Sequence, residues 1–360
     1  MKIRPGPLWA RPLGLLGSVA FAVLWAGVDA RGASASAPEP ESVSSSESDP
    51  AAEPEAESPP LPSQEDDPGN IETPIFPQAR YRDALRVRLE SSFLPNSDFG
   101  AVDVSLYAPD ARLRLTIPLS DRAVLQLRGR IGYSHYDFSG TSDLFGTGPT
   151  TGDPLDPLYR SGLSAQGAYR LNEERSFFVA GESWSLLANA FARSSWEAGQ
   201  FAQGLSGGGS LAFGYQNEKI RIALGIRLES ESTGGGVDVD PVATIRWDPT
   251  PRITVRNRGT GGQIEYRLTP SVETFVAGYV SSQSYRLADR AGASDDLKLR
   301  DRLVLVGTGF EWRINRHFRL NLEGGVVVSR KLQVRSDNTT LSSMTADTGG
   351  YLTLRVIVRP

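Results

Sequence analysis

The chain has 360 residues, 39% of them hydrophobic, a formal net charge of −4 and no cysteine. The lack of cysteine excludes disulfide bonds, thiolate metal sites, cysteine nucleophiles and lipid-modified cysteines. The charge is unevenly spread: from residue 80 onward, 34 Lys and Arg stand against 30 Asp and Glu. A mildly basic main part therefore follows an acidic leading segment.

The first 30 residues have the pattern of an export signal. Lys2, Arg4 and Arg11 precede an apolar run at 13–28, and Val28-Asp29-Ala30 offers small residues for cleavage, with Ala35-Ser36-Ala37 as a second candidate. A membrane anchor is the alternative, but this run is short beside the roughly 20 residues of a spanning helix. We therefore expect residues 1–30 to be a cleaved signal peptide that directs the protein out of the cytoplasm.

Residues 31–79 have a different composition, dominated by Pro, Glu, Ser and Ala. Eleven acidic residues lie between Glu39 and Glu72, and no basic residue lies between Arg31 and Arg80. Such a segment buries too little apolar surface to offset the entropy lost on ordering. We expect a disordered tether or spacer.

From residue 80 to 360 the dominant signal is two-residue alternation, which is typical of β-strands. It is most regular in KIRIALGIRLE at 219–229, where Ile or Leu stands at every second position and the positions between them hold charged or small residues. The expected strands are 84–93, 100–118, 123–137, 158–171, 176–191, 205–216, 219–230, 237–247, 252–258, 262–268, 271–286, 300–314, 317–332 and 349–359. The second has a candidate break at Ala108-Pro109-Asp110. Because 252–258 and 262–268 are short, a count of twelve is nearly as acceptable as fourteen.

The connections between these strands alternate in length. Short polar turns are expected at 120–122, 172–175, 217–218, 248–251, 269–270 and 315–316. Longer loops rich in Gly, Ser, Thr and Asp are expected at 138–157, 192–204, 287–299 and 334–346. Such a pattern is that of a meander of hairpins, with both ends of the main part at the short-turn end.

Two architectures use a meander of this kind, a soluble β-sandwich and an outer-membrane barrel. The long Leu, Ile and Val alternation lacks the bulky clusters of a packed core, and a closed sheet crosses a membrane with only half its side chains apolar. Most aromatic residues lie near expected strand ends, as in interfacial girdles, although Phe213, Phe275 and Phe310 fit less well. Those expected in girdles are Phe93, Phe99, Tyr107, Tyr133, Tyr136, Phe138, Tyr159, Tyr169, Phe177, Phe178, Trp247, Tyr285, Phe318 and Tyr351. We predict an all-β protein over residues 80–360, a transmembrane antiparallel up-and-down β-barrel of about 12–14 strands in the bacterial outer membrane.

The C-terminal third carries a resemblance. The segments GQIEYRL (262–268), SVETFVAGY (271–279) and GTGFEWRINRHFRLNLEGGVVVSRKLQV (307–334), followed by SDNTT (336–340), resemble a family of bacterial outer-membrane barrels catalogued as domain of unknown function 6268. The resemblance implies a strand ending in a rim turn, then a glycine-bearing strand that climbs to a surface loop. It implies no activity and no functional residues. The chain ends Val358-Arg359-Pro360, without the terminal aromatic residue of many such barrels.

Residues able to carry chemistry are few, and we expect neither an enzyme nor a cofactor. His135 and His317 are the only histidines, and Ser134, beside His135, would face the other side of the strand. Asp153 with Asp156, and Asp295 with Asp296, lack the spacing of a calcium loop. The triplets Gly207–Gly209 and Gly234–Gly236 lack the helix that a phosphate site needs.

One set of charged residues remains, on the strand face opposite the apolar one. The candidate lumen-lining residues are Arg86, Arg88, Glu90, Arg112, Arg114, Arg128, Arg130, Arg221, Arg227, Glu229, Arg252, Arg256, Arg258, Arg319, Glu323 and Arg355. Fixed charge in a lumen governs which ions enter. The leading hypothesis is a passive pore or transporter for small solutes, in which the arginines give a mild preference for anions. The alternative is a closed barrel, its lumen filled by paired side chains, whose extracellular loops bind a partner. Other expected partners are membrane lipid and the barrel-insertion machinery, but not nucleic acid.

Overall fold

The computed structural model describes residues 85–142, 144–145, 150–151, 153–171, 183–231, 236–289, 296–336, 339–346 and 348–359. The expected signal peptide and the acidic segment of residues 31–79 lie outside the described residues. Among the described residues, no helix is long and apolar enough to cross a membrane.

Every regular element of the described chain is a β-strand. The strands are β1 (Leu85–Asp98), β2 (Val102–Pro118), β3 (Ala123–Ser142), β4 (Thr150–Thr151), β5 (Leu158–Arg170), β6 (Ser183–Glu197), β7 (Leu205–Gln216), β8 (Ile220–Glu231), β9 (Val237–Thr250), β10 (Ile253–Asn257), β11 (Gly262–Arg267), β12 (Val272–Arg286), β13 (Leu297–Arg313), β14 (Phe318–Ser336), β15 (Thr339–Ala346) and β16 (Gly349–Val358). Fourteen of them form the wall, because β4 pairs only with β3 and β15 only with β14.

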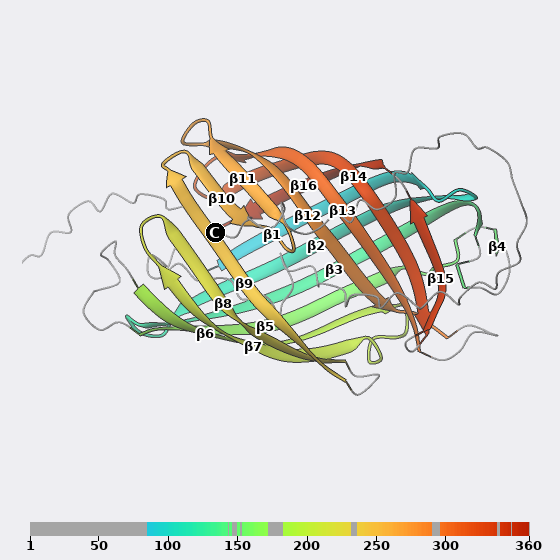
Figure 1. Ribbon diagram of the computed structural model, residues 1–360, viewed down its shortest axis with the longest axis horizontal. Coiled ribbons are helices and arrows are strands. Elements are labelled where there is room, and N and C mark those ends of the chain that lie inside the picture. Colours follow the sequence, from blue (N-terminus) through green and yellow to red (C-terminus); the bar gives the residue numbers. More distant parts are fainter. Residues whose placement is uncertain are drawn as a thin grey trace, which may run out of the picture.

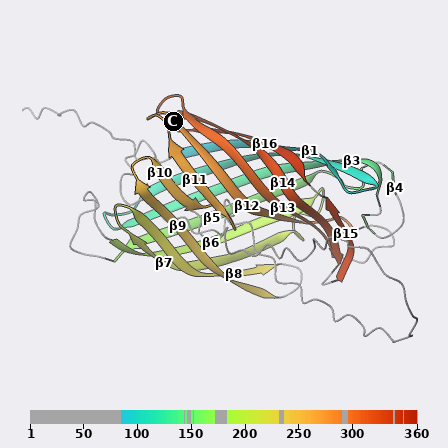
Figure 2. The same ribbon diagram turned by 45° about the horizontal axis from the view of Figure 1, so that its top comes forward.

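The wall closes on itself. Each strand pairs antiparallel with its neighbour in the chain, and β16 completes the ring by pairing with both β14 and β1. Figures 1 and 2 show the strands running obliquely around one axis. The Arg359 amide donates to the His317 carbonyl, 2.8 Å away, so the last residues lie at the short-turn end. The prediction of a closed fourteen-stranded up-and-down barrel is confirmed, and the count of twelve is wrong.

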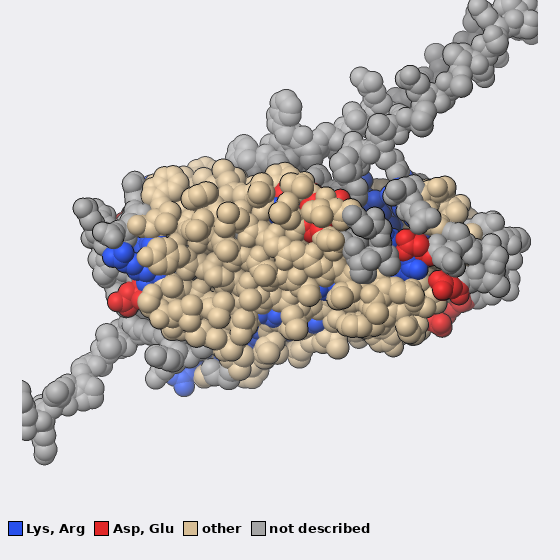
Figure 3. Space-filling model, turned by 90° about the horizontal axis from the view of Figure 1, so that it is seen from below, with Lys and Arg blue, Asp and Glu red and all other residues tan. Residues whose placement is uncertain are grey.

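Alternation gives the wall its two faces. In β8, Leu224, Ile226 and Leu228 are exposed, whereas Arg227 and Glu229 between them are buried. The face drawn in Figure 3 has a broad uncharged band around its middle, with most of the Lys, Arg, Asp and Glu near its two ends. An apolar outer band, closed backbone pairing and a charged inner face together define a transmembrane barrel of the outer-membrane type.

Aromatic side chains mark both borders of this band. Near the short turns, the exposed residues are Tyr169, Trp184, Trp247, Tyr266, Trp312 and Phe318. Near the long loops, Phe93 and Tyr107 are exposed, and the Tyr159 ring meets Tyr133 edge to face and stacks on Trp196. The girdle prediction is wrong for Tyr136, Phe138, Tyr285 and Tyr351, which are buried because their strand parity turns them inward, and for Phe99, which packs against buried side chains. Phe177 and Phe178 lie outside the described residues.

Several boundaries differ from the expected ones. β2 continues through Ala108-Pro109-Asp110, although its pairing with β3 is interrupted between Tyr107 and Asp110. The expected loop 334–346 contains the end of β14 and all of β15, because a hairpin that projects beyond the membrane has no need of apolar alternation. Likewise β3 and β6 extend into the loops expected at 138–157 and 192–204.

Candidate functional site

The register of β1, β2 and β3 brings six of the predicted arginines together. Arg86, Arg114 and Arg128 lie opposite one another across the three strands, and Arg88, Arg112 and Arg130 form a second row two residues further along. Opposite side chains in a sheet start about 5 Å apart. This inner surface of β1–β3, with Arg160 of β5 and Arg355 of β16, is called the arginine wall below.

Two carboxylates hold the upper row of the wall. Glu90 and Asp110 lie opposite each other. Glu90 contacts Arg88, Arg112 and Arg355, the last with Nε 2.6 Å from a carboxylate oxygen. Asp110 contacts Arg112 and Arg130, the latter at 2.6 Å, and Arg160 at 4.0 Å.

The lower row has neutral partners among its contacts. Arg128 donates to the side-chain oxygens of Gln126 at 3.0 Å and Gln166 at 2.5 Å. The inner positions of β1–β3 thus carry six arginines and two carboxylates, so fixed positive charge exceeds negative charge on this surface. The side chains are not sealed off, since that of Arg130 is 21% exposed.

The surface formed by β9–β14 is balanced instead. Arg246 forms a two-pronged ion pair with Asp248, with distances of 2.8 to 3.0 Å. Arg256 pairs with Glu265, and Arg319 donates to Glu311 at 2.7 Å. Positive charge is therefore concentrated on one side of the interior.

Halfway along the barrel, a buried group crosses the interior. Glu323 of β14 is completely buried; it forms an ion pair with Arg258 at 2.6 Å and accepts hydrogen bonds from the hydroxyls of Tyr351 at 2.8 Å and Tyr279 at 3.2 Å. The Arg258 guanidinium lies 4.1 Å from the centre of the Tyr279 ring. Arg258 follows β10, four strands around the wall from β14, so this ion pair joins parts of the wall that are not neighbours.

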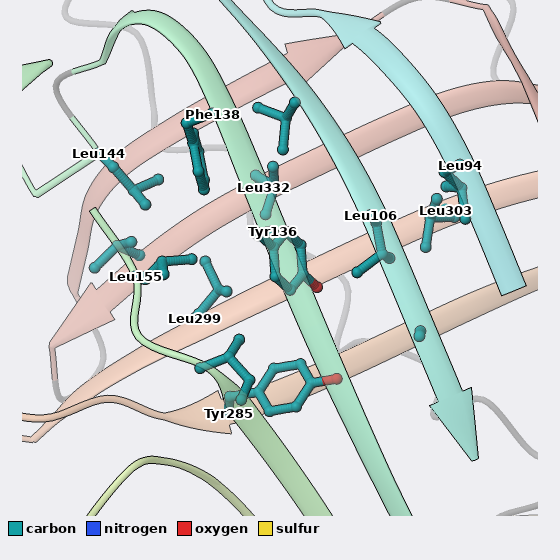
Figure 4. Close-up of a cluster of buried hydrophobic side chains, with 14 of the residues drawn as sticks. Leu94, Leu106, Tyr136, Phe138, Leu144, Leu155, Tyr285, Leu299, Leu303 and Leu332 are labelled. Carbon is teal, nitrogen blue, oxygen red and sulfur yellow. The ribbon is translucent and has the colours of Figure 1, made fainter. Parts of the chain in front are cut away.

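Beyond this group, apolar side chains, here called the apolar cluster, fill the side of the interior formed by β1–β3 and β12–β14 toward the long loops. It is built from β1–β3, β5, β12–β14 and β16 with Leu144, Phe145, Leu155 and Leu287, and Figure 4 shows side chains from facing strands meeting in it. Its fully buried members include Tyr285, Leu297, Leu299 and Leu332.

One ion pair is sealed inside the apolar cluster. Arg330 and Asp301 are 0% and 1% exposed in their side chains and lie 3.1 Å apart. Arg330 also donates to the Val104 carbonyl at 3.0 Å, and the Tyr136 hydroxyl donates to Asp301 at 3.0 Å. These bonds tie β14 and β13 to β2 and β3, across the barrel.

The other predicted residues lie elsewhere. Arg227 and Glu229 are near the long-loop end of β8, where Arg227 pairs with Asp240 at 3.1 Å and Glu229 with Arg193 at 2.9 Å. Arg221 is half-buried in β8. Arg252 is exposed in the turn before β10, because β9 runs on to Thr250 and the next strand begins only at Ile253.

Sequence reasoning missed several charged groups of the interior. Asp110 lies in the expected break of β2, although it has the same parity as Arg112 and Arg114, so extending that alternation identifies it. Arg160, Asp301 and Arg330 belong to no regular charged alternation. The histidines lie on surfaces: His135 stacks beside Tyr133 on the outer face, and His317 lies in a turn against the Arg359 carbonyl.

No family model matches the chain, and neither does any curated protein. The resemblance to the family of domain of unknown function 6268 therefore stays a prediction. Solved structures similar to the chain include the KdgM porin, at 7% identity and a TM-score of 0.30, covering 76% of this chain and 98% of that one. They also include a deltaS2 mutant of the TodX monoaromatic hydrocarbon channel (10%, 0.37, 77% and 89%).

A third similar structure is a bacterial polysaccharide outer membrane secretin, at 11% identity and a TM-score of 0.34, covering 78% of this chain and 99% of that one. Identities and TM-scores this low carry no argument about function. The proposals below therefore rest on the chain's own residues.

Proposed function

We propose that the barrel is a passive channel for small anionic solutes, with the arginine wall as its selectivity element. The observation that carries the proposal is the pair of cross-strand rows, Arg86–Arg114–Arg128 and Arg88–Arg112–Arg130, on one inner surface. Like charges placed directly opposite are unfavourable in a sheet. A surface that retains six of them is suited to an anion that neutralises them in transit.

The lower row is the part of the wall best suited to a test. Replacing Arg86 and Arg114 by Gln leaves the contacts that Glu90 and Asp110 make with Arg112, Arg130 and Arg355 intact. In a water-filled lumen, each charge is worth up to about 1 kcal/mol to a passing ion. We expect the anion-to-cation permeability ratio to fall about two- to fivefold per charge removed.

The measurement is the reversal potential of the refolded barrel in a planar bilayer under a salt gradient. The matched control replaces Arg256 and Glu265 together by Gln, which removes one ion pair and leaves the net interior charge unchanged. An unchanged ratio in the Arg86 and Arg114 variant would contradict selectivity by the wall. The same recordings without residues 38–75 separate the effect of the acidic segment.

A closed barrel with binding loops is the second candidate, and the apolar cluster favours it. Buried side chains from β2, β3, β13 and β14 fill their side of the interior toward the long loops, so a solute has no axial path along that side. A refolded barrel that shows no conductance steps, with or without residues 38–75, would support this candidate and exclude the channel.

A further inference from the structure

The wall of the barrel is incomplete on one side. β10 and β11 have five and six residues, whereas a strand that crosses a membrane needs roughly 9–11. β10 pairs with β9 only at Arg246, Trp247 and Thr250, and β11 pairs with β12 only as far as Gly278. Figure 1 shows β9 and β12 separating toward the long loops, with β10 and β11 ending between them.

The gap begins well inside the membrane. Gly262, at the tip of the short hairpin, lies four positions along β11 from Tyr266 in the short-turn aromatic band. Four residues span about 13 Å of strand, against an apolar band about 25 Å tall in barrels of this kind. Above the tip, among the described residues, no strand pairs with the facing edges of β9 (237–243) and β12 (279–285). At the long-loop end of the gap, Arg286 of β12 pairs in parallel with Trp196 of β6.

Side chains close the bottom of this gap. The Asn257 carboxamide accepts from the Ile245 amide at 2.7 Å and donates to the Ala243 carbonyl at 2.8 Å, and so takes the place of a further strand residue. Thr260 donates to the Val280 carbonyl on the opposite edge at 3.3 Å. Further up the β9 edge, Pro241 has no amide to leave unpaired.

Polar and charged groups line the part of the gap that lies above the tip of the short hairpin. On the inner face, Arg193 bonds to Glu229 at 2.9 Å, and Arg227 bonds to Asp240 at 3.1 Å and Glu229 at 3.6 Å. This chain of charges runs from β6 to the edge of β9. Along the outer face of β12, the lipid-facing Val276 gives way to Ser282 and Ser284, and Ser281, next to Ser282, lies on the inner face.

We propose that the gap between β9 and β12 is a water-filled side opening, through which anions that have crossed the arginine wall leave the barrel beside the apolar cluster. Backbone that is unpaired at membrane depth persists only where it is covered by protein or lines water. The charged inner face and the serines of β12 favour water. The anion route rests on the proposed channel function, whereas the opening itself is inferred from the strand pairing of the barrel alone.

The chain has no cysteine, so single cysteines report water access directly. Asp240→Cys and Ser281→Cys place thiols at the two edges of the opening. Leu303→Cys places one in the apolar cluster, and Val276→Cys one on the lipid face. The full chain is refolded into liposomes and treated with an anionic, membrane-impermeant thiosulfonate. Unfolded samples give the reference reactivity, and heat-modifiable migration shows that each variant has folded.

We expect both edge variants to react at least about tenfold faster than the Leu303 and Val276 variants. The negative charge attached by the anionic thiosulfonate should reduce single-channel conductance, because it repels anions. The Ser281 variant keeps the Arg227–Asp240 ion pair, so it shows whether a result with Asp240→Cys comes only from losing that pair. Edge thiols no faster than Val276→Cys would overturn the opening. Fast labelling with unchanged conductance would overturn the route. If the unlabelled barrel does not conduct, the channel proposal fails, and the labelling rates alone still decide the opening.

Discussion

At the scale of single residues, the interior depends on carboxylates that each serve several partners. Glu323 is the clearest case, because one completely buried side chain holds a guanidinium and two phenol hydroxyls from three other strands or their ends. Removing one member of a buried ion pair costs about 3–5 kcal/mol, since the other charge stays buried.

We therefore expect Glu323→Gln to lower the free energy of unfolding by about 3–5 kcal/mol. The amide keeps the shape and can still accept from Tyr279 or Tyr351, but it leaves the charge of Arg258 without its carboxylate. The measurement is a urea titration in liposomes followed by tryptophan fluorescence. In Glu323→Gln with Arg258→Met the loss should be smaller. A loss below about 1 kcal/mol for the single variant would contradict this view of the pair.

Residue identity alone predicted part of this interior. Parity placed Arg86, Arg88, Arg112 and Arg114 on one face because their strands are regular. Parity did not reveal that Glu323 and Arg258 meet, because a contact between strands four apart depends on the curvature of the closed wall. For the same reason, parity did not predict the buried contacts that Arg330 and Asp301 make with β2 and β3.

At the scale of strands, close packing across the wall requires glycine at defined positions. Tyr351 of β16 lies opposite Gly325 of β14, which lies opposite Gly307 of β13. A Cβ at Gly307 would stand 2.0 Å from the Tyr351 hydroxyl and 2.9 Å from the Gly324 carbonyl. The ring thus lies across two strands that present no side chain beneath it.

Gly307→Ala is therefore expected to destabilise the barrel by about 1–3 kcal/mol through overpacking. The loss should shrink in a Tyr351→Leu background, where the hydroxyl is absent. Gly167→Ala is the matched control, because nothing lies within 4 Å of its Cβ position. The temperature at which the folded gel band disappears reports each change. Equal effects of the two alanine substitutions would rule out the ring as the cause.

Strand positions were well predicted, and the main failure has a local cause. In β14, Arg319, Asn321 and Glu323 point inward at odd positions, but after the irregularity opposite Val304 and Leu305 the buried residues are Arg330, Leu332 and Val334, at even positions. An extra residue flips every later side chain to the other face. Two-residue periodicity does not reveal such a bulge. The sequence therefore did not predict that the end of β14 turns its apolar side chains into the interior.

At the scale of the whole molecule, the barrel interior is polar and electropositive toward the short turns, whereas toward the long loops the apolar cluster fills its β1–β3 and β12–β14 side. Selectivity that arises from fixed charge is screened by salt, whereas selectivity from sieving is not. The Debye length falls from about 10 Å at 0.1 M to about 3 Å at 1 M.

We expect the anion preference of the refolded barrel to approach unity between about 0.1 and 1 M potassium chloride. Reversal potentials measured at a fixed concentration ratio, but at several mean concentrations, provide the check. Uncharged sugars of increasing size serve as the control, because their exclusion should not change with salt. A preference that persists at 1 M would point to a narrow constriction instead of the arginine wall.

The seam between β1 and β16 has a consequence for the order of assembly. Glu90 and Arg355 are separated by 265 residues of chain, yet they form an ion pair across that seam. Contacts between such distant positions form slowly, because a long loop must close before they stabilise anything. A nascent chain cannot make this junction until the last strand has been synthesised. The Glu90–Arg355 ion pair of the arginine wall is therefore among the last contacts of the molecule to form. It forms in the same step that closes the ring of strands.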